Sequence, residues 1–205
     1  MDEESLLDIY DGFPREFLDE HYTRYLADHE NKIKEIEARL PKVDMSMANP
    51  IYCTLRSLNI EYTHALNSVK LHKYYFENIA NKASAPPSTE MLGMLERNFG
   101  SPQEWEKQFF ALAMCARGWV VLGLDLEEGT LRNYFSDSHA EGVWSVAPLL
   151  VLDVYEHAYC TTFPNRRDYI RVFLKNVNWA VVNKRLYNAM NMYNSRTANL
   201  SRGGR

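Results

Sequence analysis

The sequence predicts an α+β fold, with an N-terminal antiparallel helical hairpin followed by an α/β domain that holds a small three-stranded antiparallel sheet. Two long amphipathic patterns come first, a small and proline-rich segment at 83–88 follows them, and short β-branched or aromatic runs appear only after Gly118. We therefore expect a hairpin domain at 1–84, an α/β metal-binding domain at 85–192 and a flexible tail at 193–205.

The first helix of the hairpin is predicted at 14–40. Apolar or aromatic residues and one histidine recur there in steps of three and four, at Leu18, Tyr22, Tyr25, His29, Ile33, Ile36 and Leu40. Pro41 is expected to end this helix. After a break at Pro50, a second pattern runs through Ala65, Val69, His72, Phe76 and Ile79. Two successive helices joined by a loop pack as antiparallel neighbours.

The second half of the chain mixes helices and strands. A short helix is predicted at 89–98, and the capping box that begins with Ser101 and Pro102 starts another, which runs to about Ala116. The later helices are predicted at 165–176 and 179–191. Strands are predicted at 118–124, 131–136 and 148–154, and a hairpin turn at Glu128–Gly129 joins the first two.

Composition argues against several classes of function. The net charge of −4 and the lack of a basic block give no reason to expect nucleic-acid binding. No stretch approaches the roughly 18 apolar residues that a membrane span needs, so we expect no membrane partner. The acidic N-terminus resembles neither a secretory signal nor a transit peptide. Three widely spaced cysteines, Cys53, Cys115 and Cys160, indicate a reducing compartment, and we expect the cytoplasm.

Histidines and one carboxylate form a candidate metal site. His21 lies at the edge of the first helix's apolar stripe, and His72 lies on the apolar seam of the second helix, so packing of the hairpin would bring them together. The apolar strand at 148–153 ends on Asp153, and His157 follows four residues later. A buried carboxylate is costly unless it is paired or bound to a cation. Three imidazoles and one carboxylate suit iron, manganese or catalytic zinc, but a single histidine on an apolar face is more commonly a hydrogen-bonded core residue.

A resemblance to a known family favours the metal site. Asp153-Val154-Tyr155-Glu156-His157-Ala158-Tyr159 resembles the Asp-x-Trp-Glu-His-Ala-Tyr signature of iron/manganese superoxide dismutases, with tyrosine in place of tryptophan. Shorter segments match in order and spacing between about residues 10 and 187: Phe99-Gly100-Ser101, Gly118-Trp119, Pro148-Leu149-Leu150 and Asn178-Trp179-x-x-Val182. The resemblance implies an antioxidant oxidoreductase that converts superoxide to dioxygen and hydrogen peroxide at one iron or manganese ion per subunit. It also implies that the ligands are His21, His72, Asp153 and His157.

The family also implies residues around the ion. A glutamine or histidine contacts the metal-bound solvent there; His139 resembles the histidine variant, whereas Ser68 at the alternative helical position is too short. His29 stands where the family carries a gateway tyrosine, so His29 and His139 are the catalytic candidates. His64 has no assigned role and is expected at the surface or rim.

Assembly and competing functions follow from the same resemblance. Glu156 matches the residue that bonds the partner's His157 equivalent, which implies a homodimer. Tyr25 and Cys160 replace another cross-subunit pair, so that bond is expected to be lost. The main alternative is a catalytically inactive relative that serves as a structural or assembly subunit, which the change to His29 favours and the retained ligands oppose. A zinc hydrolase is the less favoured alternative, and the choice between iron and manganese stays open.

Overall fold

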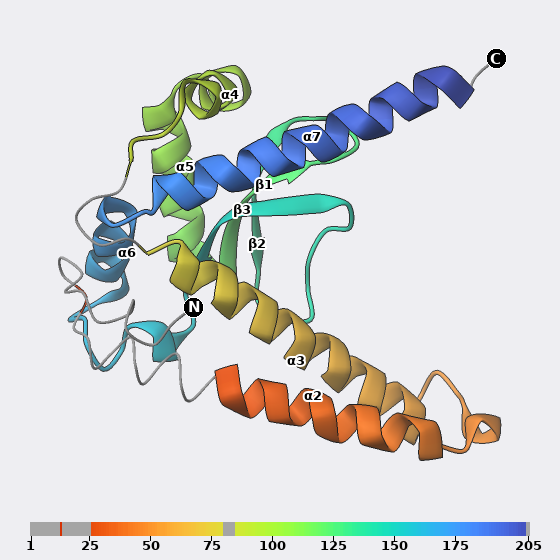
Figure 1. Cartoon of the computed structure of the whole chain (residues 1–205). Helices are drawn as coiled ribbons and strands as arrows, with labels where there is room; N and C mark the ends of the chain where they lie inside the picture. The colour runs from red at the N-terminus through yellow and green to blue at the C-terminus, as the bar shows by residue number, and fades with distance from the viewer. Residues whose placement is uncertain (1–12, 14–25, 80–84, 204–205) are drawn as a thin grey trace.

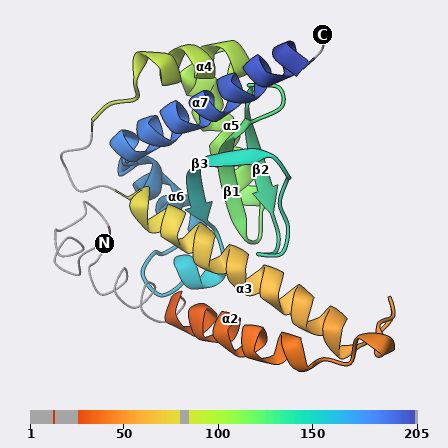
Figure 2. The ribbon, with the colours of Figure 1, turned by 45° about the vertical axis from the view of Figure 1, so that its right-hand side comes forward.

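The computed structural model describes residue 13 and residues 26–79 and 85–203. Its N-terminal part is a hairpin of two helices that lie side by side and antiparallel (Figures 1 and 2), α2 (Ala27–Arg39) and α3 (Thr54–Glu77). Two short 3-10 turns connect them, η3 (Leu40–Lys42) and η4 (Met45–Met47). The predicted hairpin is confirmed for the described residues, and the part of the first predicted helix before residue 26 lies outside them.

Local sequence explains where these helices begin and end. α2 ends at Arg39 because Pro41 follows, and Pro41 lies in the first turn of η3. The backbone N–H of Arg56 donates to the Cys53 thiol, which caps the start of α3. Across the hairpin, the Tyr62 hydroxyl donates to Glu37 and Lys73 pairs with Glu30, at 3.1 and 2.8 Å.

Two helices follow the segment 85–88, and both begin on a serine. In α4 (Thr89–Phe99) the Ser88 hydroxyl accepts the backbone N–H of Met91, and in α5 (Pro102–Cys115) the Ser101 hydroxyl accepts that of Glu104, at 3.1 and 3.0 Å. Gly100 ends α4 with a φ of +89°, a conformation in which a side chain would be strained. The predicted start of a helix at Ser101 and Pro102 is therefore confirmed.

The sheet has three antiparallel strands in the order β2-β1-β3: β1 (Trp119–Asp125), β2 (Leu131–Ser136) and β3 (Val146–Asp153). β1 lies in the centre, and its first residue, Trp119, is level with Ser136 of β2 and Asp153 of β3. This register places the end of β3 beside the loop that follows β2, which is the loop that carries His139.

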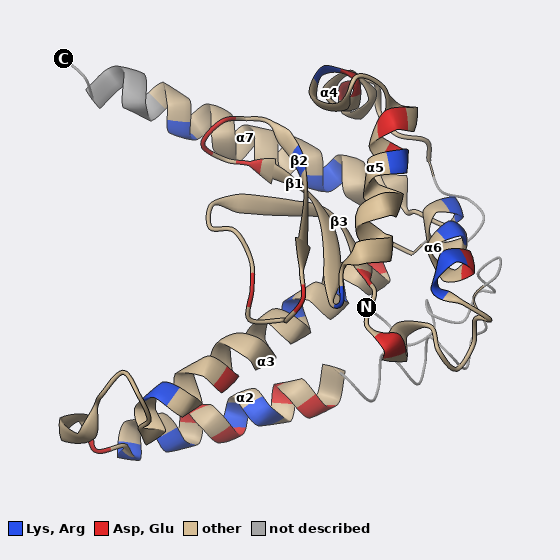
Figure 3. Ribbon diagram, turned by 180° about the vertical axis from the view of Figure 1, so that it is seen from behind, with Lys and Arg blue, Asp and Glu red and all other residues tan. Residues whose placement is uncertain are grey.

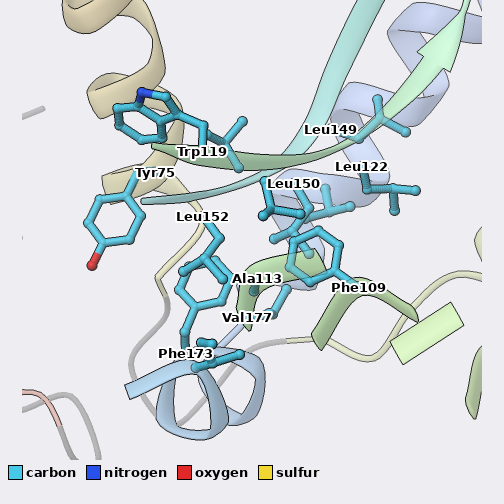
Figure 4. Packing of buried hydrophobic residues seen from close by; sticks show 14 of the residues in the cluster. Tyr75, Phe109, Ala113, Trp119, Leu122, Leu149, Leu150, Leu152, Phe173 and Val177 are labelled. Carbon is cyan, nitrogen blue, oxygen red and sulfur yellow. The ribbon is translucent and has the colours of Figure 1, made fainter. Parts of the chain in front are cut away.

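The core lies between the sheet and the helices that pack on it. α3 and α7 contact β3, whereas α5 contacts β1 and β2. Figure 4 shows Leu122, Leu150 and Leu152 of the strands packed with Phe109 of α5 and Phe173 of α6. Burial of these apolar side chains supplies the main stabilisation of the domain, roughly 1.5–3 kcal/mol for each large side chain.

Two C-terminal helices complete the fold, α6 (Arg166–Lys175) and α7 (Trp179–Gly203). The prediction that the last helix ends near residue 191 is wrong, because α7 continues to Gly203. Its second half packs on the β1–β2 hairpin, where the Tyr193 ring lies so close to Gly129 that a Cβ there would be 2.6 Å from it. Arg196 also pairs with Glu127 at 3.0 Å. These contacts stabilise the polar second half of α7.

Charged residues are spread along the hairpin, whereas the ribbon of the sheet carries few of them (Figure 3). Among the described residues, no helix combines the length and the apolar character that crossing a lipid bilayer requires.

Candidate metal centre

The site lies where α3 passes the end of the sheet. Asp153 is the last residue of β3, and His72 lies near the end of α3, which packs on that strand. After β3 the chain turns into the 3-10 helix η5 (Glu156–Ala158), which brings His157 back toward Asp153. Asp153 and His72 are fully buried, and the His157 side chain is 23% exposed. The fold thus brings His72 beside Asp153 and His157, which are close to each other in the chain but far from His72.

The tautomer of His72 follows from its hydrogen bonds. Nδ1 of His72 lies 2.8 Å from the backbone carbonyl oxygen of Ser68, one helical turn earlier. Because a carbonyl oxygen only accepts, Nδ1 carries the proton and Nε2 carries the lone pair. This arrangement is typical of a metal-binding histidine, whose second nitrogen donates to a carbonyl or carboxylate.

The two carboxylate oxygens of Asp153 have different neighbours. Oδ1 accepts the backbone N–H of Tyr155 at 2.9 Å, which fixes the carboxylate at the strand end. Oδ2 lies 3.4 Å from Nε2 of His72 and 3.4 Å from Nε2 of His157. All three of these atoms lie within 4.8 Å of one another.

This geometry fits a transition-metal ion. Two donor atoms that each lie about 2.1 Å from one ion, at an angle of about 110°, are about 3.4 Å apart. The lone pair of His72 Nε2 and the negative Oδ2 of Asp153 repel each other directly, whereas a cation between them would attract both. Imidazole nitrogen with carboxylate oxygen suits iron, manganese or zinc.

Buried tyrosines support the strand end that carries Asp153. The Tyr169 hydroxyl donates to the backbone carbonyl of Asp153 at 2.6 Å and lies 3.1 Å from the Tyr75 hydroxyl. Burial raises the pKa of both tyrosines far above the ordinary value, so both hydroxyls keep their protons. Arg166 donates to the carbonyls of Val154 and Ala116, at 2.9 and 2.7 Å, and ties this turn to the end of α5.

His139 lies over the same site from the sheet side. The Trp119 indole N–H donates to its Nδ1 at 2.7 Å, so Nδ1 carries the lone pair. Burial lowers the pKa of His139 to about 3, and the imidazole is therefore neutral at pH 7 with its only N–H at Nε2. The ring centroid lies 5.8 Å from that of His72 and 4.7 Å from that of Tyr155. Tyr155 also stacks on His157, with 5.3 Å between centroids.

Two further histidines surround the entrance side of His139. The ring centroid of His29, on α2, lies 5.6 Å from that of His139 and 6.4 Å from that of His72. Burial lowers the pKa of His29, and repulsion from His72 lowers it further. His64 is partly buried, and its ring lies 4.6 Å from the His139 ring at an interplanar angle of 80°. This partly exposed position agrees with the expected rim location, and the contact with His139 adds to it.

The structure brings together most of the residues that the sequence suggested. His72, Asp153 and His157 converge, and His29 and His139 lie beside them. His21, the remaining predicted ligand, lies outside the described residues.

Sequence reasoning missed the contacts that His64, Asn67 and Trp119 make with His139. A signal for two of them was present, because His64, Ser68 and His72 recur at intervals of four and Asn67 falls on the same helix face. The role of Trp119 had no local signal, since it depends on the register of three strands.

Comparisons with known proteins agree with this geometry. Residues 87–185 match the family model described as iron/manganese superoxide dismutases, C-terminal domain. The chain is 37% identical over 175 residues to a superoxide dismutase [Fe] of Aquifex aeolicus, covering 84% of this chain and 82% of the relative. A superoxide dismutase [Fe] of Cupriavidus metallidurans is 30% identical over 172 residues, or 82% and 85% of the two chains. A superoxide dismutase [Mn] of Haloarcula marismortui is 38% identical over 111 residues, which cover 53% of this chain and 55% of that protein.

Proposed function

Because this chain belongs to the iron/manganese superoxide dismutase family, and is an enzyme that acts on superoxide with one iron or manganese ion per subunit, we propose which of its residues hold that ion and serve the reaction. The proposed ligands are His21, His72, Asp153 and His157. The observation that carries this assignment is the convergence of the last three residues. Nε2 of His72 and Nε2 of His157 each lie 3.4 Å from Oδ2 of Asp153.

When bound, the ion supplies the electron transfer, taking an electron from one superoxide and giving it to another. The second superoxide also takes up two protons to become hydrogen peroxide, so the residues around the ion must place proton donors. We assign this role first to His139, whose single N–H is at Nε2 because Trp119 occupies Nδ1. A neutral imidazole in this position orients solvent at the site without adding charge.

His29 is proposed as the gateway residue. Its ring lies close to both His139 and His72, and it is only partly buried, so it lies between the site and the exposed side of the hairpin. An imidazole at this position can exchange hydrogen bonds with entering superoxide and with solvent.

A homodimer in the cytoplasm is proposed for the assembly and location. Glu156 is exposed beside the partly exposed His157, as expected for an acid that bonds the partner's copy of that histidine. Cys53, Cys115 and Cys160 are all free thiols, which suits a reducing compartment. Sedimentation of the wild type and of Glu156→Ala tests the dimer, and the variant should shift toward monomer.

The ligand assignment is tested by removing the charge of Asp153. Asp153→Asn keeps the side-chain shape but removes the anionic ligand, so it should lose most of its bound metal and its superoxide turnover. His21→Ala tests the ligand outside the described residues in the same way. Metal content is measured by mass spectrometry after loading with iron or manganese, alongside a superoxide assay.

Glu61→Gln is the matched control, because it makes the same carboxylate-to-amide change at an exposed position of α3. It should keep full metal content and turnover. Retention of one ion per subunit and of full turnover by Asp153→Asn would contradict the assignment. A folded wild type that takes up neither metal would instead favour a structural subunit.

A further inference from the structure

We propose that His64 and Asn67 are positioning residues for this enzyme, which hold His139 in the orientation that the reaction needs. The inference rests on the role proposed for His139 and extends it to two residues of α3. Among the described hydrogen bonds, the side chains of these two residues make none to the proposed ligands, and both residues contact His139. The inference is drawn from two contacts that one face of α3 makes with the loop of His139.

The first point is a hydrogen bond to the backbone. The side-chain amide of Asn67 donates to the backbone carbonyl of His139 at 2.8 Å, across 72 positions of the chain. The loop 137–145 connects β2 to β3 without regular secondary structure. The Asn67 bond therefore does for the His139 backbone what the hydrogen bonds between paired strands do for a strand residue. Asn67 therefore sets where the backbone of His139 lies relative to α3.

The second point is a contact with the ring. The His64 imidazole meets the His139 imidazole edge to face, with 4.6 Å between centroids and an interplanar angle of 80°. Tyr155 contacts the same ring at 4.7 Å and Trp119 at 5.5 Å. Removal of the His64 ring would leave space next to His139, and a side chain that has lost a packing neighbour samples more orientations.

The consequence for the reaction follows from the tautomer of His139. The proton stays at Nε2 only while Nδ1 accepts from the Trp119 indole at 2.7 Å, and a rotated ring would lose that bond. His64 and Asn67 thus act through His139, and their loss should lower turnover without loss of metal. By analogy with other residues that orient the surroundings of an ion, we expect a decrease of roughly tenfold.

The test uses the Trp119 indole as a probe, because its N–H signal in a nitrogen-15 NMR spectrum reports the bond to His139 directly. The NMR spectrum is recorded on the metal-free full chain, since a bound iron or manganese ion is paramagnetic and would broaden this signal, and turnover is measured on the metal-loaded enzyme. His64→Ala and Asn67→Ala should shift or broaden the Trp119 signal and speed its exchange with solvent. The Trp105 indole, which donates to Asn133 at 3.0 Å, is the internal reference and should not change.

Two control variants separate positioning from general damage. His64→Phe keeps an aromatic ring and should restore most of the Trp119 signal and the turnover. Asn59→Ala removes an exposed asparagine of the same helix whose amide bonds only to its own helix, at Leu55, and should leave both readouts unchanged.

The results have distinct meanings. An unchanged Trp119 signal in both alanine variants overturns the proposal, and so does an altered signal with wild-type turnover. The NMR readout needs no metal, so it can succeed or fail separately from the ligand assignment, which is decided by the metal content of Asp153→Asn.

Discussion

A neutral imidazole has one N–H and one lone pair, and in His139 the Trp119 indole decides which nitrogen carries which. The same logic applies to His72, where the Ser68 carbonyl fixes the proton at Nδ1. These hydrogen bonds thus fix the tautomers of both imidazoles, with the proton at Nε2 in His139 and at Nδ1 in His72. The partners in both hydrogen bonds, the indole and the carbonyl, are neutral groups.

At His139 this predicts a difference between two substitutions. His139→Ala removes the Nε2 donor and should lower superoxide turnover by roughly 10- to 100-fold while one metal ion per subunit stays bound. His139→Gln should recover much of that loss, because an amide can accept from the Trp119 indole and donate to the site. Turnover is compared at equal metal content, measured on the same samples, and equal rates for alanine and the wild type would rule out the assigned role.

Residue identities indicated the convergence of Asp153 and His157 better than they indicated the residues that surround them. Asp153 and His157 lie four residues apart around one strand end, so their proximity is a local property that a sequence motif can record. The His64 and Asn67 contacts join α3 to a loop more than 70 positions later, as the Asn67 bond shows. The four-residue spacing on α3 marks the helix face, but it does not indicate which loop that face contacts.

At the scale of elements, Arg185 of α7 joins three parts of the fold. It donates to the backbone carbonyl of Leu149 in β3 and to the Asn78 side chain after α3, at 3.0 and 3.1 Å, and pairs with Glu77. Its guanidinium also lies 4.1 Å from the centroid of the Tyr74 ring. Burial lowers the pKa of Arg185, while the Glu77 carboxylate opposes that shift.

Arg185→Ala should therefore destabilise the protein by about 3 kcal/mol, because it removes charge-assisted hydrogen bonds to the Leu149 carbonyl and the Asn78 side chain together with the contact on the Tyr74 ring. Arg132→Ala is the matched control: its pair with Glu128 is exposed at both ends and should contribute less than about 1 kcal/mol. Urea unfolding of both variants measures the difference, and equal midpoints would show that Arg185 contributes no more than a surface charge.

Helices were predictable where the periodic apolar pattern extended over a long segment or where capping residues and prolines marked an end. Ser101 and Pro102 marked the start of α5, and Pro41 marked the end of α2. The end of α7 was not predictable, because the polar residues after Tyr193 are held by contacts with the β1–β2 hairpin at Gly129 and Glu127 rather than by their own pattern.

For the whole molecule, the proposed ligands link α3 of the hairpin with the end of the sheet, so the ion should act as a cross-link between them. Removing the metal should lower the free energy of unfolding, by about 4 kcal/mol if the free ion stands near a thousand times its dissociation constant. Calorimetry of the metal-free and reloaded protein measures the change as a lower melting temperature without metal. Identical melting temperatures would show that the ion does not bridge these parts.

Sequence periodicity predicted the α+β architecture, but it did not predict the complete site. Periodicity records which side of an element faces the core, whereas the way in which α3 lies across β3 depends on the packing of the assembled core. The predicted division at residue 84 stays a prediction, and the contacts of α3 with β3 and of Arg185 with Asn78 cross it.

The separation of His72 from Asp153 along the chain has a consequence for biosynthesis. A ribosome finishes the segment with His72 long before it reaches β3, and η5 with His157 comes later still. A nascent chain therefore offers isolated imidazoles but no complete pocket, so metal uptake has to wait until translation has passed η5.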